Sequence, residues 1–391
     1  MIDIKGHPCR NMMIFFKRLL HRNSRVLILI CILMFFLNSP ASGKQTIDIA
    51  AIYALTGIAA ENNSFSLEGI YYGVDEINAT GGILGRKIKI LEFDNKSTPI
   101  GSSLAAAKAV KSSAVAILGS AWSSHSLAVA KIAQQMEIPM ISNVSTNPEV
   151  TKTGDYIFRI CFTDALQGKV LAKFARQDLN AKTAVIFIDV ASDYSLKLSE
   201  IFRLNFEQMG GKVVLELDYK PKQMFLKKEI LQAVKFNADV IFIPGHDESG
   251  EIARKLQTAG ARSIFLGGDG WASRVFLSRG GQELKQGYYS THWSTQLDTQ
   301  ESNTFTQQYI RSEISAANIA LGYDAVMLLA NAVKRAGSFD RKKIKQAIAD
   351  TRNFKGVTGT ITFNKRGDPD KSAVFMEIRK GKPYYLKVLE P

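Results

Sequence analysis

Cysteine is scarce in this sequence of 391 residues, which contains only three. Two of them precede residue 44, so Cys161 is the only cysteine in the remainder of the chain. A single cysteine excludes an internal disulfide and a cysteine-ligated zinc site from that part. Cys161 stands between Ile160 and Phe162, and we interpret it as a small residue of the hydrophobic core.

The motifs of common enzymes are absent as well. The sequence has no Gly-x-Ser-x-Gly elbow, no phosphate-binding Gly-x-x-x-x-Gly-Lys-Ser/Thr loop and no His-Glu-x-x-His helix. His125, His246 and His292 are far apart and lack paired carboxylates at metal-ligand spacing. Ser123 and His125 form the one candidate hydrolytic pair, but side chains at i and i+2 of a helix do not face each other. We expect no catalytic residue, no metal site and no cofactor.

Long apolar runs are lacking except near the N-terminus. A basic stretch in residues 17–25 precedes an apolar run from Val26 to Leu37, which small and polar residues 38–43 follow. This order is typical of a signal peptide, and a run of 12 residues is shorter than the roughly 20 that span a bilayer as a helix. We therefore predict a signal peptide at residues 1–43 and a periplasmic protein, with an uncleaved anchor as the alternative.

Acidic residues are fewer than basic ones, but the excess is moderate. The full chain has a net charge of +14, and residues 44–391 have 44 basic and 35 acidic residues, a net of +9. The densest basic run, residues 341–345, lies in a predicted amphipathic helix, where a solvated face is a better interpretation than a nucleic-acid patch. Export also argues against nucleic acid as a partner.

Short apolar segments alternate with helical patterns from Thr46 onward, which predicts parallel sheets covered by helices on both faces. The first series has strands at 47–53, 87–93, 115–118 and 139–142 and helices at 64–78, 101–112 and 123–136. The second has a helix at 164–178 and strands at 184–188, 213–217, 240–243 and 264–266, each followed by another helix. The pattern predicts two doubly wound α/β lobes.

The C-terminal part returns to helices and then to antiparallel strands. Helices are predicted at 302–312, 323–336 and 340–350, and strands at 359–363, 373–379 and 384–389. This order indicates that the chain crosses between the lobes more than once. We assign residues 44–163 to the first lobe, with a return segment at about 293–355, and residues 164–292 to the second, with a β tail at about 356–391.

Polar loops follow several predicted strands, and ligands of doubly wound sheets bind beyond the carboxyl ends of the strands. Ser123 lies where such a loop enters a helix, whose N-terminus suits an anion such as a carboxylate. Residues 142–148 add hydroxyls and backbone groups on the same side of the sheet. Asp269 lies between glycines in the second lobe and could neutralise an ammonium group. The alternatives are a helix cap for Ser123 and a turn residue for Asp269.

Three segments together resemble a known family: Leu55-Thr56-Gly57, residues 69–86 with their Asn-Ala-Thr-Gly-Gly-Ile-Leu-Gly-Arg ending, and residues 141–149, Ile-Ser-Asn-Val-Ser-Thr-Asn-Pro-Glu. The sequence from about Thr46 to its end is similar to the leucine/isoleucine/valine-binding family of periplasmic receptors for ATP-driven importers. The resemblance implies the type I periplasmic binding protein fold, with two lobes joined by three crossovers that close over a ligand.

The resemblance also implies roles for five residues. In members of this family, the residues that match Ser123 and Thr146 bind the ligand carboxylate. The carbonyl that matches that of Val144 and the acid that matches Asp269 receive the ammonium group. Tyr194 matches an aromatic residue that lines the cleft from the second lobe. The partners implied are a small amino acid or related carboxylate and the membrane permease of an ABC transporter.

Three positions depart from the family pattern. Asn62 and His246 stand where the family often has aromatic residues, so the pocket for the ligand side chain is expected to be more polar than one built for leucine. Asp269 is also shorter than the commoner glutamate, which predicts a longer or water-bridged contact with the ammonium group.

Two other classes of function stay open at this point. One is a ligand-sensing regulatory module of the same fold, which would signal instead of delivering its ligand. The other is an exported α/β enzyme, which would need an activated nucleophile or a metal near the cleft. We favour a receptor that binds without turnover.

Overall fold

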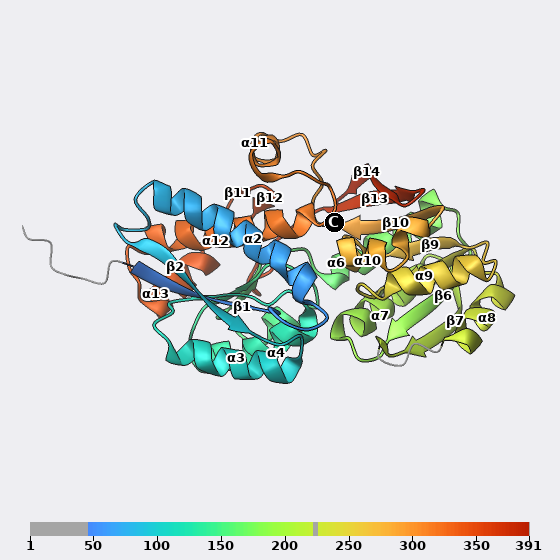
Figure 1. Ribbon diagram of the computed structural model, residues 1–391, viewed down its shortest axis with the longest axis horizontal. Helices are drawn as coiled ribbons and strands as arrows, with labels where there is room; N and C mark the ends of the chain where they lie inside the picture. The colour runs from blue at the N-terminus through green and yellow to red at the C-terminus, as the bar shows by residue number, and fades with distance from the viewer. Residues whose placement is uncertain (1–45, 222–225, 391) are drawn as a thin grey trace, which may run out of the picture. The chain divides into compact units, whose positions relative to one another are not determined.

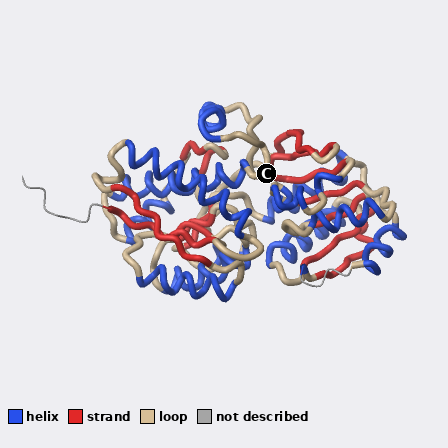
Figure 2. The backbone as a smooth tube through the Cα atoms, in the orientation of Figure 1, coloured by secondary structure: helices blue, strands red, loops and turns tan. Residues whose placement is uncertain are grey.

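Two sheets organise the chain, one in each predicted lobe; the first is parallel and the second is mixed. The computed structural model describes residues 46–221 and 226–390, and the predicted signal peptide lies outside the described residues. Figure 1 shows the order of the elements, and Figure 2 shows strands enclosed by helices around each sheet.

The first sheet has five parallel strands in the order β2-β1-β3-β4-β5. The strands are β1 (Thr46–Tyr53), β2 (Lys87–Asp94), β3 (Ile117–Gly119), β4 (Met140–Ser142) and β5 (Ile157–Arg159). The helices that connect them are α2 (Ala60–Ala79), α3 (Pro99–Lys111), α4 (Ser123–Gln135) and α5 (Glu149–Lys152). This lobe therefore has the doubly wound arrangement that the alternating pattern predicts.

The side chains of β1 alternate between two hydrophobic layers because successive residues of a strand point to opposite faces. Ile49 and Ala51 pack with α2 and with two later helices, whereas Ala50 and Ile52 pack with α3 and α4. All four residues are buried. The continuous apolar sequence of β1 thus reflects helices on both faces of the sheet.

The second sheet has seven strands in the order β14-β13-β10-β9-β8-β6-β7. Its strands are β6 (Thr183–Asp189), β7 (Lys212–Tyr219), β8 (Val240–Ile243), β9 (Ile264–Gly267), β10 (Gln286–Thr291), β13 (Ala373–Arg379) and β14 (Lys382–Leu389). Its helices are α6 (Asp164–Lys173), continued by a π-helical turn at Phe174–Asp178, α7 (Asp193–Gln208), α8 (Lys227–Phe236), α9 (Ser249–Thr258) and α10 (Arg274–Ser278). The strand β13 is antiparallel to β14, as the tail pattern predicts, and it also pairs antiparallel with β10.

The return segment brings three more helices and a short hairpin. They are α11 (Gln300–Tyr309), α12 (Ala316–Ala336), α13 (Arg341–Ala349), β11 (Phe354–Gly356) and β12 (Gly359–Ile361). The chain passes between the lobes after β5, after β10 and between β12 and β13. Two doubly wound lobes and three crossovers confirm the predicted fold.

The exact division of the chain into lobes stays a prediction, but one segment packs elsewhere than expected. The predicted tail of the second lobe begins at about residue 356. Ile361 and Phe363 are buried in the first core, beside residues of α12 and α13. Only from Ala373 onward does the chain join the second sheet.

Three strands are missing from the sequence prediction, and helices α2 and α12 begin earlier than predicted, α2 at Ala60 instead of residue 64. The strands β5 and β11 have three residues each, too few to show a period, and β10 contains Gln286, Gly287, Ser290 and Thr291, which weaken its apolar pattern. Helix α12 begins at Ala316 instead of residue 323, and Gly322 lies inside it.

Gly322 lies where α12 crosses α2 at close range. A Cβ atom at Gly322 would lie 2.1 Å from the carbonyl oxygen of Ser66, and one at Gly69 would lie 1.9 Å from that of Ile319. Glycine on both helices is what permits this approach. Helix α12 is long and apolar enough to cross a membrane by composition alone, but most of it is buried in the protein core.

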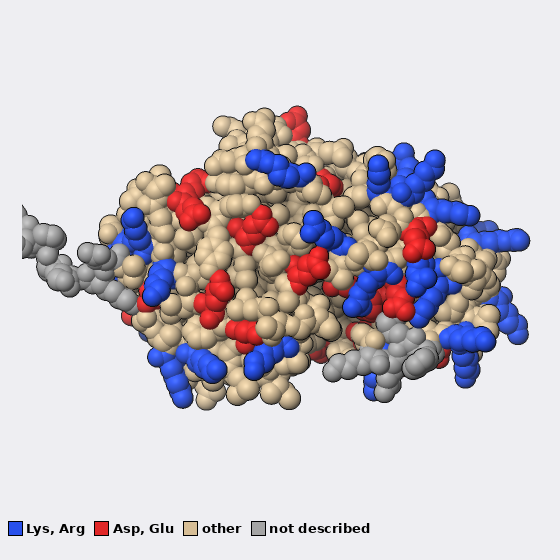
Figure 3. Space-filling model, in the orientation of Figure 1, with Lys and Arg blue, Asp and Glu red and all other residues tan. Residues whose placement is uncertain are grey.

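Charged side chains of both signs are interspersed on the face drawn in Figure 3, with Lys and Arg more crowded over the second lobe. The basic run at residues 341–345 lies on α13, as predicted. Its Ile344 is buried in the first core, while Lys342 and Lys343 are exposed. These lysines thus lie on the solvated face of an amphipathic helix.

Replacing Gly322 tests the helix crossing. Alanine normally stabilises a helix interior by up to about 1 kcal/mol relative to glycine. We expect Gly322→Ala to lower the free energy of unfolding instead, by about 1 to 3 kcal/mol, because the added methyl group meets backbone atoms. Denaturant unfolding of both proteins measures the change. Asn331→Ala, on the exposed face of α12, serves as the control, and a stabilised Gly322→Ala protein would contradict the explanation.

Candidate functional site

A cavity lies where the carboxyl ends of the strands in the two lobes meet. It is narrow in this conformation, with a cavity volume of about 20 Å³. Its lining is Asn62, Ala121, Trp122, Ser123, Val144, Thr146, Tyr194, His246, Asp269, Gly270 and Asn318. All seven residues predicted for the site, Asn62, Ser123, Val144, Thr146, Tyr194, His246 and Asp269, are among them. Their roles toward a ligand stay predictions.

The first wall of the cavity contains the N-terminus of α4. Ser123 is the first residue of this helix and is 2% exposed, and the cap position is Trp122, whose side chain makes no capping hydrogen bond. The alternative that Ser123 caps the helix is therefore wrong. Its Oγ accepts a hydrogen bond from the backbone N–H of Asn147 at 3.3 Å, which links α4 to the loop that follows β4.

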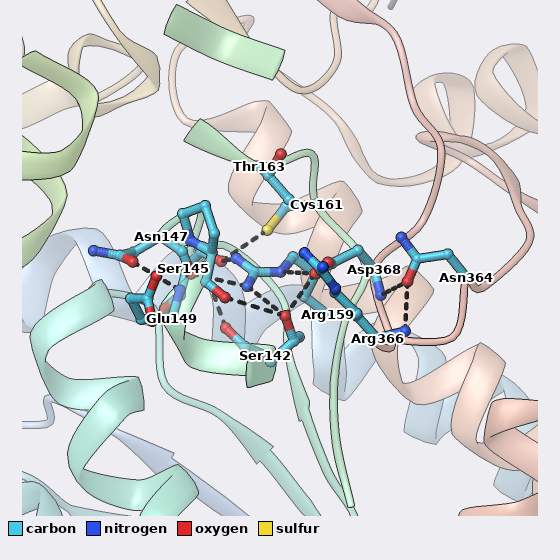
Figure 4. Close-up of polar contacts among 12 residues, drawn as sticks. Ser142, Ser145, Asn147, Glu149, Arg159, Cys161, Thr163, Asn364, Arg366 and Asp368 are labelled. Carbon is cyan, nitrogen blue, oxygen red and sulfur yellow. Dashed lines mark hydrogen bonds and ion pairs between the residues drawn. The ribbon is translucent and has the colours of Figure 1, made fainter. Parts of the chain in front are cut away.

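That loop, residues 142–148, is held by the buried side chain of Arg159 (Figure 4). The guanidinium donates to the carbonyl oxygens of Ser145 and Asn147, the latter at 2.8 Å. Its Nε pairs with Oδ1 of Asp368 at 2.6 Å, from the turn before the third crossover. These contacts fix the loop on both sides of Thr146, which is 1% exposed.

The second wall contains the carboxylate of Asp269, in a short 3₁₀ turn (Asp269–Trp271) after β9. Its Oδ1 accepts a hydrogen bond from Nε2 of Gln167 at 2.8 Å, and its Oδ2 lies 3.2 Å from Nε2 of His292. Burial raises the pKa of Asp269, but the hydrogen bonds and charge interactions of His292, Gln167 and Tyr194 outweigh burial and hold it below the usual value. The carboxyl is therefore ionised at neutral pH.

A second acid near this wall has the opposite shift. Asp164 begins α6 and is fully buried. Burial raises the pKa of Asp164 well above its usual value, and the nearby charge of Asp269 raises it further. Asp164 is thus held neutral, so Asp269 carries the negative charge of the pair.

An aromatic stack joins the two lobes beside the cavity. The rings of Trp122 and His246 are 4.2 Å apart and nearly parallel, at 3°, and the rings of Tyr194 and His246 are 5.0 Å apart. Burial lowers the pKa of His246, which keeps its imidazole neutral in this stack. The ring of His125 lies 5.4 Å from that of Trp122, and burial lowers the pKa of His125 to about 4.

Hydrogen bonds also cross between the lobes near the cavity. The side-chain amide of Asn147 donates to the carbonyl oxygen of Asp193 at 2.8 Å, and the backbone N–H of Asp193 donates to Ser124 Oγ at 3.2 Å. Together with the Trp122–His246 stack, they indicate that the described conformation is a closed one.

A pair of amides forms another part of the lining. Asn62 lies in the first turn of α2 and Asn318 in the first turn of α12. Nδ2 of Asn318 donates to Oδ1 of Asn62 at 2.6 Å. Both residues are half-buried.

Sequence reasoning missed four residues of this region: Trp122, Gln167, His292 and Asn318. The sequence spacing gives His292 no carboxylate partner. This expectation is wrong, because Nε2 of His292 lies 3.2 Å from Oδ2 of Asp269. In residues 46–221 and 226–390, no group of three or more His, Cys, Asp or Glu side chains could hold a metal ion. Of these four residues, only Trp122 could have been found from the sequence, because it directly precedes Ser123 in the same loop.

The profile of the periplasmic binding protein family matches residues 46–383, nearly the whole described chain. The chain belongs to this family. This membership agrees with the two-lobed fold and with a cavity at the meeting strand ends.

Individual relatives of this periplasmic binding protein are similar over most of their length. The Leu/Ile/Val-binding protein BraC3 of Rhizobium johnstonii is 27% identical over 326 residues, 82% of this chain and 88% of that protein. The solved leucine binding protein LivK of Thermotoga maritima is 32% identical, with a TM-score of 0.83 over 88% of this chain and 99% of its own. LivJ of Streptococcus pneumoniae, solved with isoleucine, is 29% identical, with a TM-score of 0.82 over 88% and 100%.

The Arg159 contacts give a first prediction for the site of this binding protein. Asp368→Asn leaves the buried guanidinium without its charged partner, so we expect the free energy of unfolding to fall by about 3 kcal/mol. Denaturant unfolding provides the measurement. Asp370→Asn is the matched control, because Asp370 is exposed and two residues away. Equal stability of the two variants would show that the pair does not hold the loop.

His125 gives a pH-dependent prediction. In the folded protein the pKa of His125 is about 4, against 6.5 for the unperturbed side chain. Between these values the unfolded chain binds more protons, so the stability that neutral His125 contributes is lost as pH falls. We expect the wild type to lose about 2 kcal/mol more than His125→Gln between pH 7 and pH 5. Parallel stability curves for the two proteins would contradict this account.

Proposed function

We propose that the protein is an exported receptor that captures a small α-amino acid between its lobes and delivers it to an ABC importer. The observation that carries the proposal is the opposition of charges across one cavity. The N-terminus of α4, with Ser123, lies in one wall, and the ionised carboxylate of Asp269 lies in the other. An α-amino acid has one negative and one positive group, and these two walls suit them in turn.

The anion end is assigned to the carboxylate of the ligand. Ser123 and Thr146 offer hydroxyl groups, and the first turn of a 13-residue helix offers backbone N–H groups and a partial positive charge. Because Arg159 holds the carbonyl oxygens beside Thr146, this loop needs little reordering when a ligand arrives. The arrangement favours a carboxylate over a neutral group.

The cation end is assigned to the ammonium group. Gln167 and His292 orient the Asp269 carboxylate before any ligand binds. The carbonyl of Val144, at the cavity wall, is the proposed second acceptor. Since Asp164 is neutral, this end holds one negative charge, which matches a single ammonium group.

Binding without turnover follows from the chemistry of the lining. Ser123 is the one lining residue with a hydroxyl at a helix N-terminus. Among the described residues no imidazole is hydrogen-bonded to this hydroxyl, so the arrangement of an activated nucleophile is not formed there. Ligand contacts from both walls would stabilise the closed form, which a permease could recognise. The signal-like residues 1–43 support the proposal that the receptor reaches the periplasm by export.

Removing the Asp269 charge tests the proposal. We expect Asp269→Asn to weaken binding of an α-amino acid by roughly 30-fold or more, because the ammonium group would then be buried without a counter-charge. Residues 44–391, refolded to remove bound ligand, would be titrated by calorimetry with amino acids and with the matching acids that lack the ammonium group. Asp370→Asn serves as the control.

Two results would change the assignment. If only carboxylates without an ammonium group bind, the receptor binds another class of acid and Asp269 has a different role. Formation of a product from any bound compound would contradict binding without turnover.

A further inference from the structure

We infer that this receptor selects an amino acid whose side chain both donates and accepts hydrogen bonds, such as a carboxamide, over a branched aliphatic one. The inference rests on the proposed function, since it concerns the same cavity and assumes an α-amino acid in it. The residues that carry it are Asn62 and Asn318, which line the cavity and are assigned neither to the carboxylate nor to the ammonium group.

The hydrogen bonding of this pair leaves two groups unused. Nδ2 of Asn318 donates to Oδ1 of Asn62. The NH₂ group of Asn62 and the side-chain carbonyl oxygen of Asn318 therefore stay available for hydrogen bonds to a ligand. Within the described residues, no other side-chain hydrogen bond of either amide is formed. Exchanging the oxygen and nitrogen of both amides keeps their mutual bond and still leaves one NH₂ group and one oxygen. In either arrangement the pair offers one donor group and one acceptor.

A carboxamide has the complementary groups, one carbonyl oxygen and one NH₂ group. It could accept from one asparagine and donate to the other. A leucine or isoleucine side chain could do neither, and closure would remove water from both amides without replacing its hydrogen bonds. Sites built from buried hydrogen-bonding groups reject analogues that lack the matching groups far more strongly than apolar pockets reject an extra methylene.

The rest of the lining gives a branched aliphatic side chain little apolar contact. Ala121 and Val144 are the only aliphatic residues among the eleven that line the cavity. Trp122 presents an aromatic ring that is already stacked on His246. The pocket therefore has flat ring faces and polar groups, which suit a planar amide better than a branched alkyl group.

Asparagine and leucine form a matched pair of probes, because their side chains have nearly the same size and shape and differ in polarity. We expect the wild-type receptor to bind asparagine or glutamine roughly tenfold or more tighter than leucine or isoleucine in calorimetric titrations. This comparison needs no variant, so a folding defect cannot obscure it.

Variants locate the preference in the amide pair. Asn62→Leu and Asn318→Leu should each weaken asparagine binding and bring the affinities for asparagine and leucine together or reverse them. Asn331→Leu, on the exposed face of α12, should leave the wild-type preference unchanged. Thermal unfolding of each variant without ligand verifies that it is folded.

The outcomes separate the inference from the function on which it rests. If leucine or isoleucine binds as tightly as asparagine or glutamine, the inference is overturned and the amino-acid receptor stands. If no α-amino acid binds the wild type, both are overturned. If asparagine is preferred but the preference survives in Asn62→Leu and Asn318→Leu, the amide pair does not produce it and the inference is overturned.

Discussion

The buried guanidinium of Arg159 connects the parts of the protein that must keep their positions for the site to exist. It lies at the end of β5, just before the first crossover, and pairs with Asp368, which precedes the third. Its other nitrogens hold the loop that contains Thr146. A change at this ion pair would therefore affect stability, the region of the crossovers and the cavity wall that contains Thr146 together. A buried ion pair is not in itself stabilising, but a guanidinium left without its partner is strongly destabilising.

Burial decides which groups of the cavity carry charge. Asp164 and Asp269 are both acids in a dry environment, and only at Asp269 do the neighbouring donors and charges outweigh burial. His246 is kept neutral by the same burial. The cavity thus has one full negative charge in one wall and the partial positive charge of a helix N-terminus in the other, which is a simpler pattern than the number of ionisable side chains suggests.

The sequence predicted which loops line the cavity because parallel strands place their following loops at one edge of the sheet. Ser123, Thr146 and Asp269 could be found in this way, and the family resemblance added Asn62, Val144, Tyr194 and His246. Gln167, His292 and Asn318 could not, because their importance depends on contacts between segments about 20 to 250 residues apart. The start of α12 was misjudged for a related reason. Gly322 indicates a break by propensity, but its role is to let α2 approach, which only the packing reveals.

Closure of such a receptor depends on the interactions that differ between its open and closed forms. The Trp122–His246 stack and the hydrogen bonds of Asp193 with Ser124 and Asn147 exist only while the lobes are together. They favour the closed form even without a ligand, and a ligand that binds both walls adds to them. If they became too strong, the empty receptor would be mostly closed, and ligand entry and recognition of the loaded state would both suffer. Their small number, and their position at the margin of the cavity, leave the ligand as the component that can decide the equilibrium.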